Sequence, residues 1–261
     1  MELRHQKLTR YIVPLREGGS LPAMGEADDG FRYAVKFRGA GHGTKSLIAE
    51  LIGGLVAKAL KFNVPEVVLL DLNPLFGITE PDEEIQDLLR KSEGLNMGLH
   101  FLDGAVTFDP SVNKVDDLTA SKIVWLDAFL TNVDRTRQNP NMMVWHNELW
   151  LIDHGASLYF HHSGKDAEIA AADPFAFIKT HALLPYACRL EEADKLMRQA
   201  ITPRTLNKIV DLVPDEWLIH EEGKEVEEVR KYYKDFLTKR IRGSKIFVDK
   251  AIEERNNLLK S

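Results

Sequence analysis

Short apolar runs and alternating stretches dominate the first third of the chain, and these patterns indicate β-strands. Residues 11–15 form a short apolar run, residues 31–37 alternate with period two, and residues 66–72 are almost continuously apolar. In 31–37 the aromatic and branched residues share one face, and Lys36 belongs to the opposite face. Residues 98–102 are either a further strand or a connection to the second half of the chain.

Helical periodicity first extends over residues 47–62, and Ser46 is the predicted N-cap. One broad face of this segment is apolar. The opposite face carries Glu50, Gly53 and Gly54, where a solvated face would carry lysines and glutamates. Two glycines inside a helix cost about 1 kcal/mol each relative to alanine. We therefore expect another backbone to approach this face closely, with Glu50 in the contact.

The remainder of the chain is largely helical, interrupted by a polar loop at 133–141 and a hairpin pattern at 142–152. Periodic apolar positions predict helices over 81–91, 118–132, 191–200, 203–211, 223–240 and 244–259. Strands early and helices late indicate an α+β protein. We expect two lobes, a small β-rich lobe over 1–100 and a larger helical lobe over 101–261.

Composition and charge narrow the class of protein. The 261 residues are 44% hydrophobic and 28% charged, as in globular proteins, with a formal net charge of −6. This charge argues against attraction of the whole protein to nucleic acid or to an anionic membrane. The single cysteine, Cys188, excludes an intramolecular disulfide and a multi-cysteine zinc site. No apolar stretch has the length of a membrane span or a signal peptide, so we expect a cytoplasmic protein without membrane contact.

The segment between Asp134 and Gly155 carries residue types suited to phosphoryl transfer. Asn139 follows Asp134 in the polar loop, and the hairpin then leads to Asp153 and Gly155. In this chemistry a carboxylate accepts the proton of the attacking hydroxyl, while an amide oxygen and a second carboxylate hold Mg²⁺ on the phosphates of ATP. A hairpin returns the chain to its start. We therefore expect Asp134 to be catalytic, and Asn139 and Asp153 to be neighbouring metal ligands.

The N-terminal third supplies the remaining parts of a nucleotide site. Lys36 stands in Tyr-Ala-Val-Lys, a variant of the kinase pattern in which a strand lysine contacts the α- and β-phosphates. Glu50 follows on the small-residue face of its helix, where it pairs with Lys36 or is stabilised by the helix dipole. Gly18, Gly19 and Ser20 form either a loop that covers phosphates or a simple hairpin turn.

Other polar residues near these positions have open interpretations. Arg135 and Arg137 flank the loop and either hold a substrate phosphate or carboxylate, or are solvated. His154, His161 and His162 lack further ligands at fixed spacing, so we expect loop histidines rather than a metal site.

These motifs together resemble the HipA-like kinase family, bacterial relatives of protein and phosphoinositide kinases. The resemblance is carried by YAVKF, TKSLIAELI, FNVPEV, NVDRTRQN and LIDHG, and more loosely by FLTKRIRGSKIFVDKA. It implies a two-lobed fold that binds ATP and Mg²⁺, with Lys36 as the nucleotide lysine, Asp134 as the catalytic-loop aspartate, and Asn139 and Asp153 as the metal ligands.

The chain departs from the family pattern at two positions. Arg135-Thr136 replaces the Arg-His or Gly-His that often follows the catalytic aspartate, and His154 stands where classical protein kinases have phenylalanine. We also expect the extra N-terminal subdomain of the longer HipA toxins to be missing, so a toxin role and an antitoxin partner do not carry over from the resemblance.

We therefore expect an ATP- and Mg²⁺-dependent kinase whose acceptor is a Ser or Thr hydroxyl of a protein. One alternative is a small-molecule or lipid head-group acceptor, because phosphoinositide kinases share the Asp-Arg-x-x-x-Asn order. An open groove beside Asp134 would favour a protein acceptor, and a closed polar pocket a metabolite. A second alternative, a non-catalytic nucleotide-binding regulatory module, is disfavoured by the presence of all three of Asp134, Asn139 and Asp153.

Overall fold

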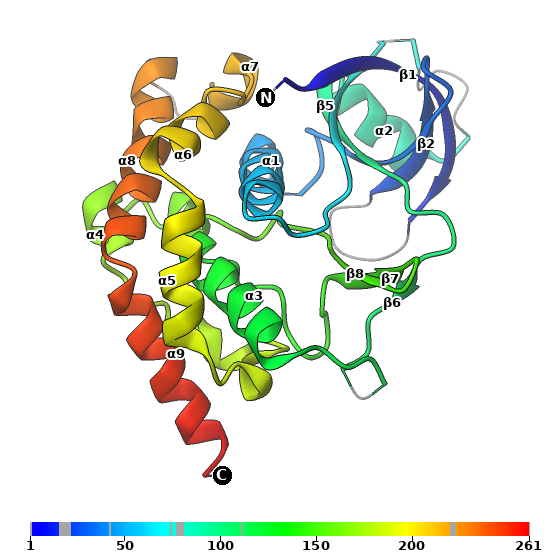
Figure 1. Cartoon of the computed structure of the whole chain (residues 1–261). Coiled ribbons are helices and arrows are strands. Elements are labelled where there is room, and N and C mark those ends of the chain that lie inside the picture. Colours follow the sequence, from blue (N-terminus) through cyan, green and yellow to red (C-terminus); the bar gives the residue numbers. More distant parts are fainter. Residues whose placement is uncertain are drawn as a thin grey trace.

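A closed five-stranded barrel forms the N-terminal part of the molecule (Figure 1). The structure is a computed structural model that describes residues 2–15, 22–41, 43–73, 75–76, 81–110, 112–219 and 223–260. The barrel strands, in spatial order, are β1 (Arg4–Pro14), β2 (Ala23–Ala27), β3 (Arg32–Lys36), β5 (Gly94–His100) and β4 (Val67–Leu72). All neighbouring strands are antiparallel except β1 and β4, which are parallel.

The alternation along β3 has the predicted consequence. Tyr33, Val35 and Phe37 are buried in the core of the barrel, whereas Lys36 points to the other side. Phe31 was predicted to share their face, but it lies before the strand begins and is 51% exposed. The alternation therefore holds from Tyr33 to Phe37 and fails at Phe31.

Two barrel strands are longer than the apolar pattern indicates. β1 begins at Arg4, well before the apolar run at Tyr11, and β5 extends back to Gly94 and ends at His100. From Arg4 to Thr9, exposed residues of β1 alternate with residues that are at least partly buried, and Leu8 is the buried one among them. A strand with one solvated face needs few apolar residues, so its full length is set by its pairing partners.

Helix α1 (Thr44–Ala59) packs between the barrel and the C-terminal helices (Figure 1). The helix begins at Thr44, so the prediction of Ser46 as N-cap is wrong; the N-cap is Gly43, and no side chain caps the helix. The small-residue face is approached closely, as expected. A Cβ atom added at Gly53 would lie 2.6 Å from the Cβ atom of His154.

The longer predicted helices are confirmed, with ends shifted by a few residues. They are α2 (Glu83–Lys91), α3 (Asp117–Leu130), α5 (Leu190–Ala200), α6 (Pro203–Val210), α8 (Val226–Arg242) and α9 (Lys245–Leu258). Sequence patterns missed the short elements α4 (Ala167–Ala171), α7 (Asp215–Leu218), η1 (Tyr159–His162), η2 (Ala176–Thr180) and η3 (Leu184–Tyr186). One turn of helix is too short to show a hydrophobic period.

The hairpin is also confirmed. β7 (Met142–Trp145) and β8 (Glu148–Leu151) pair across the turn His146-Asn147, and β6 (Val106–Thr107) completes a three-stranded sheet. His146 and Asn147 have φ angles of 49° and 64°. Two consecutive residues with positive φ are the mark of a tight turn whose twist matches that of the strands.

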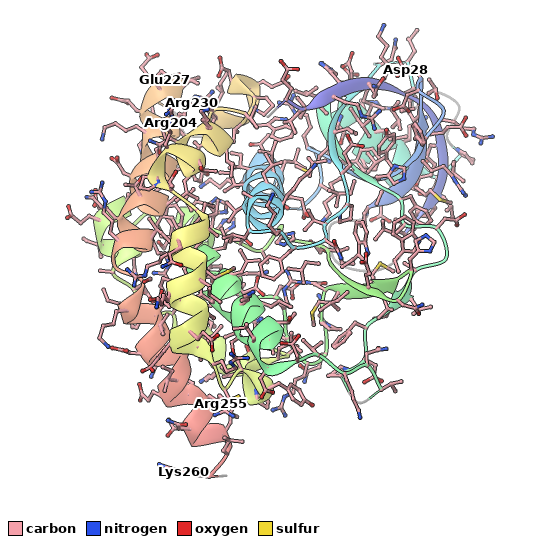
Figure 2. All side chains as sticks on the ribbon, viewed as in Figure 1. Asp28, Arg204, Glu227, Arg230, Arg255 and Lys260 are labelled. Atoms are coloured by element: carbon pink, nitrogen blue, oxygen red, sulfur yellow. The ribbon has the colours of Figure 1, made fainter. Side chains whose placement is uncertain are left out.

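Buried arginines hold the helical part together by donating to carbonyl groups at helix ends. Arg230 of α8 donates to Val210 O and Val213 O at 2.9 and 3.0 Å, at the end of α6 (Figure 2). Arg240 donates to Ala128 O and Phe129 O at 2.6 and 2.8 Å, and burial lowers the pKa of its guanidinium to about 9. These bonds satisfy carbonyls at the end of α3, from which the polar loop at 133–141 starts.

Candidate active site

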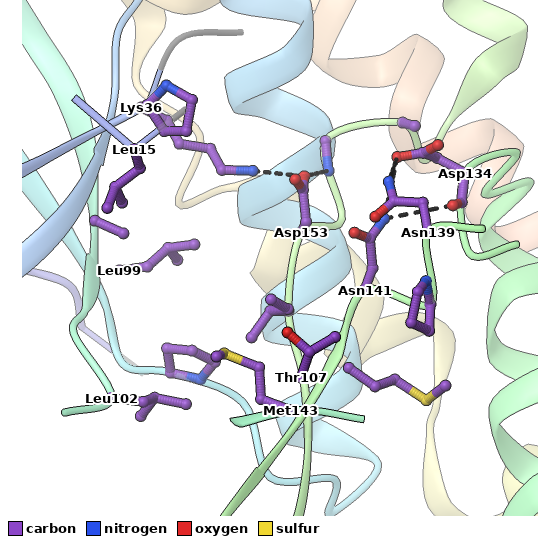
Figure 3. A pocket seen from close by; sticks show the side chains of 18 of the residues that line it. Leu15, Lys36, Leu99, Leu102, Thr107, Asp134, Asn139, Asn141, Met143 and Asp153 are labelled. Carbon is purple, nitrogen blue, oxygen red and sulfur yellow. Dashed lines mark hydrogen bonds and ion pairs between the residues drawn. The ribbon is translucent and has the colours of Figure 1, made fainter. Parts of the chain in front are cut away.

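A cavity of about 1680 Å³ lies where the barrel faces the loop at 133–141 and the hairpin (Figure 3). Its lining includes four of the residues singled out in the sequence: Lys36, Asp134, Asn139 and Asp153. They come from β3, from the loop after α3 and from the segment after β8. The fifth, Glu50, reaches the same place through its contact with Lys36.

Lys36 is bound by two carboxylates. Its Nζ atom lies 2.6 Å from Glu50 Oε2 and 2.6 Å from Asp153 Oδ1. Burial would lower the pKa of Lys36, but the charges of Glu50 and Asp153 outweigh it and raise that pKa above its ordinary value. Burial would likewise raise the pKa of Glu50, but the charge of Lys36 and a hydrogen bond from His154 hold it well below its ordinary value. Both Lys36 and Glu50 are therefore charged in the buried pair.

The segment from Asp153 to Gly155 is fitted tightly against α1. Asp153 has a φ angle of 51°, an uncommon conformation for a residue with a side chain. The backbone N–H of His154 donates to Glu50 Oε1 at 3.1 Å, and its side chain packs on Gly53. A Cβ atom at Gly155 would lie 3.1 Å from Ser46 Oγ. Glu50 thus holds both the strand lysine and the segment that carries Asp153.

Two amide side chains orient the carboxylate of Asp134. Asn139 Nδ2 donates to Asp134 Oδ2 at 2.8 Å, and Asn141 Nδ2 donates to the same oxygen at 3.1 Å (Figure 3). The backbone N–H of Asp134 donates to Asn132 Oδ1 at 3.1 Å. With Oδ2 engaged twice, Oδ1 is the oxygen left for a further donor in the cavity.

Arg135 is a structural residue, so its predicted alternatives, substrate contact or solvation, are both wrong. Its side chain is fully buried, and its Nε atom lies 2.6 Å from Asp127 Oδ2. His181 Nε2 lies 2.9 Å from the same oxygen, and His181 Nδ1 accepts from Leu183 N. Burial would raise the pKa of Asp127, but the charge of Arg135 and the hydrogen bond from His181 hold it below its ordinary value. This buried network anchors the loop at 133–141 to the helical core.

Of the three predicted loop histidines, His154 donates its backbone N–H to Glu50 and the exposed His162 lines the cavity. His154 and His161 are buried, and His161 Nδ1 lies 3.1 Å from the hydroxyl of Tyr233. Within the described ranges no group of three or more His, Cys, Asp or Glu side chains is arranged to hold a metal ion. Gly18, Gly19 and Ser20 lie outside the described residues.

Sequence reasoning missed two residues that support the candidate site. Asn141 follows a proline in the loop and has a φ angle of 47°, a conformation that asparagine tolerates better than most residues. Asp127 lies on the helix that precedes the loop, and a carboxylate in an otherwise apolar helix body was the available signal.

A buried lysine–glutamate pair, an aspartate followed by an asparagine in a loop, and an Asp-x-Gly segment after a hairpin define a kinase-type site. The family comparison is specific. The chain belongs to the HipA-like kinase family, whose sequence profile matches residues 9–242. No curated protein matches the chain.

The chain is similar to solved structures that include two kinases. The proinflammatory kinase CtkA of Helicobacter pylori has a TM-score of 0.57 and 14% identity, covering 95% of this chain and 98% of that one. A Golgi casein kinase has a TM-score of 0.47 and 14% identity, covering 97% of this chain and 75% of that one. At this identity the likeness to CtkA shows the fold alone, which is that of a kinase. Separately, none of the helices in the described ranges has the length and apolar character needed to cross a membrane.

Proposed function

We propose that the chain is an ATP- and Mg²⁺-dependent kinase that transfers the γ-phosphate to a Ser or Thr hydroxyl of a protein. The proposal includes a two-lobed organisation, with the lobes meeting near residue 100 and the nucleotide bound in the cavity between them. The observation that carries it is the double contact of Lys36 with Glu50 and Asp153, 2.6 Å each, in a cavity that Asp134 and Asn139 also line.

The cavity offers an apolar region and a polar region, as a nucleotide requires. Ala34, Leu99, Met143 and Ile152 line the apolar region and suit a purine base. Lys36 stands at the polar region, where its ammonium group would contact the phosphates while Glu50 holds it in place.

The polar residues fit a magnesium ion. Asp153 keeps 41% of its side chain exposed despite the ion pair with Lys36, and Asn139 is exposed and uses its amide nitrogen for Asp134. A carboxylate and an amide oxygen are therefore available, and Mg²⁺ commonly binds through one or two such groups together with substrate phosphates. When bound, the ion would neutralise charge on the phosphates during transfer.

Asp134 would act on the acceptor. Its Oδ1 atom would accept the proton of the attacking hydroxyl while Asn139 and Asn141 hold Oδ2. The hydroxyl oxygen then forms the new bond to the γ-phosphorus, and the bond between that phosphorus and the β–γ bridging oxygen breaks. The electron pair leaves with ADP, so atoms and charge balance.

The substitution Asp134→Asn separates chemistry from nucleotide binding. Asp134 pairs with amides and not with Lys36, so ATP affinity should stay close to that of the parent. The rate of transfer should fall about 10²–10⁴-fold, the usual contribution of a positioned general base. Single-turnover transfer from γ-labelled ATP to proteins of a cell extract, with nucleotide binding measured in parallel, provides the test.

The control is Asp166→Asn, at an aspartate that caps the short helix α4 and does not line the cavity. It should transfer phosphate at the parental rate. A parental rate in Asp134→Asn would eliminate Asp134 as the catalytic residue. A parent protein that binds ATP but transfers phosphate to no protein or metabolite would favour a regulatory module.

A further inference from the structure

Two segments flank the proposed catalytic loop and are hydrogen-bonded to it. On one side, Val133 N donates to Ala156 O at 3.4 Å, and Tyr159 N donates to Thr131 Oγ1 at 3.1 Å. On the other side, Ala182 N donates to Arg135 O at 3.0 Å, just after η2. These bonds tie the backbones of both segments to the catalytic loop that carries Asp134.

Each flanking segment exposes an aromatic side chain. Tyr159 is 45% exposed and Phe177 is 55% exposed, and their ring centroids lie 5.8 Å apart in an edge-to-face arrangement. Tyr159 also lines the cavity together with Asp134, as does the exposed His162. The rings contact each other across the junction of the two segments, so they form one apolar surface that continues from the cavity. We call Tyr159 and Phe177 the aromatic shelf.

Two exposed cations lie on the catalytic loop and on the segment that carries Phe177. Arg137 is exposed on the catalytic loop, and Lys179 is exposed on η2, two residues after Phe177. Thr136 and His181, which are neighbours of these cations along the chain, are joined by a β-bridge. Neither Arg137 nor Lys179 has an ion-pair or hydrogen-bond partner within the described part of the chain. The bridge ties the two segments together, and exposed cations without such partners favour an anionic partner.

From this juxtaposition we propose that the aromatic shelf and the two cations bind the acceptor, and that the acceptor is an extended protein segment. This inference rests on the proposed function. The segment carries a bulky apolar side chain, which packs on Tyr159 and Phe177, and acidic residues, which pair with Arg137 and Lys179. A small polar metabolite would use neither the exposed rings nor cations placed outside the cavity.

The first experiment uses the whole chain, γ-labelled ATP and a degenerate peptide library with one fixed Ser or Thr acceptor. We expect selection of Phe, Leu or Met at one position near the acceptor, and of Asp or Glu at another. Substituting Phe177→Ala should abolish the apolar selection and lower kcat/KM for the selected peptide about tenfold, while KM for ATP stays at the parental value. Tenfold corresponds to about 1.4 kcal/mol.

Matched controls separate docking from folding. Phe31→Ala removes an aromatic ring of similar exposure, 51%, from the barrel and should leave peptide kinetics unchanged. Lys179→Glu should weaken phosphorylation of the acidic peptide and be rescued by a peptide with Lys in place of its acids. The control is Lys195→Glu, at an exposed lysine of α5, which should phosphorylate the acidic peptide at the parental rate.

The outcomes are distinguishable. Phosphorylation of the library without selection, or unchanged peptide kinetics in Phe177→Ala, would overturn the docking proposal and leave the kinase proposal standing. Transfer only to small hydroxyl compounds would overturn docking together with the protein acceptor. A parent that neither binds ATP nor transfers phosphate would remove the proposed function, and the docking proposal with it.

Discussion

The substitution Glu50→Gln tests whether the buried ion pair organises the site. It replaces a carboxylate that is 1% exposed and accepts from both Lys36 Nζ and His154 N. Glutamine keeps the size of the side chain and can still accept from the backbone of His154. It cannot neutralise Lys36, so the main change is the loss of one charge next to a buried ammonium group.

The magnitude follows from the geometry. At 2.6 Å and an effective dielectric constant of about 20, the attraction between the two charges is about 6 kcal/mol. Burying the charge of Glu50 costs several kcal/mol, and burying a neutral glutamine costs less. Removing one partner of a buried ion pair typically lowers the free energy of unfolding by about 3–5 kcal/mol. Because Asp153 still pairs with Lys36, we expect the free energy of unfolding to fall by about 3 kcal/mol.

Urea unfolding followed by tryptophan fluorescence measures this loss, with Glu192→Gln as the control. Glu192 pairs with Arg189 at the same 2.6 Å, but both side chains are nearly half exposed. An exposed pair contributes about 0–1 kcal/mol, so the control should lose little stability. Equal losses in the two variants would refute the reasoning, because burial is the feature that distinguishes them.

The loss should also depend on pH with a definite sign. The folded-state pKa of Glu50 lies below its ordinary value of 4.5, so its stabilising contribution is present above that pH and disappears as pH falls through the folded-state pKa. The difference between parent and Glu50→Gln should therefore be full near neutral pH and shrink below pH 4.5. A difference that stays constant down to acid unfolding would assign the loss to packing instead of charge.

Two further predictions concern the metal and the glycine face of α1. Asp153→Asn should weaken Mg²⁺-dependent ATP binding, because a charged oxygen ligand becomes neutral. ATP titrations with and without Mg²⁺ measure this effect. Equal metal dependence in parent and variant would exclude Asp153 as a ligand. Gly53→Ala should destabilise the protein by about 1–3 kcal/mol, since the new Cβ would lie 2.6 Å from the Cβ of His154. In Gly54→Ala the new Cβ would make an ordinary 3.5 Å contact with Val67, so the protein should gain up to about 1 kcal/mol of stability. Stability losses of similar size at both glycines would contradict the close-approach explanation.

Local patterns in the sequence were sufficient to place several parts of the candidate site. Alternation in β3 put Lys36 on the face opposite the barrel core, and the small-residue face of α1 indicated that Glu50 lay in a close contact. The turn at His146-Asn147 identified the hairpin that leads to Asp153. These features depend on neighbours a few positions away, because the strand repeat, the helix repeat and tight turns are all short-range.

Tertiary structure alone decided how these parts are supported and which side chains are exposed. Arg135 carries no sign in the sequence that it is buried, and only its contact with Asp127 makes it structural. The support of His154 by Glu50 spans 104 positions, a separation that no periodicity reports. No sequence pattern singled out Tyr159 or Phe177. The structure leaves both side chains exposed, because burial depends on which distant segments pack together.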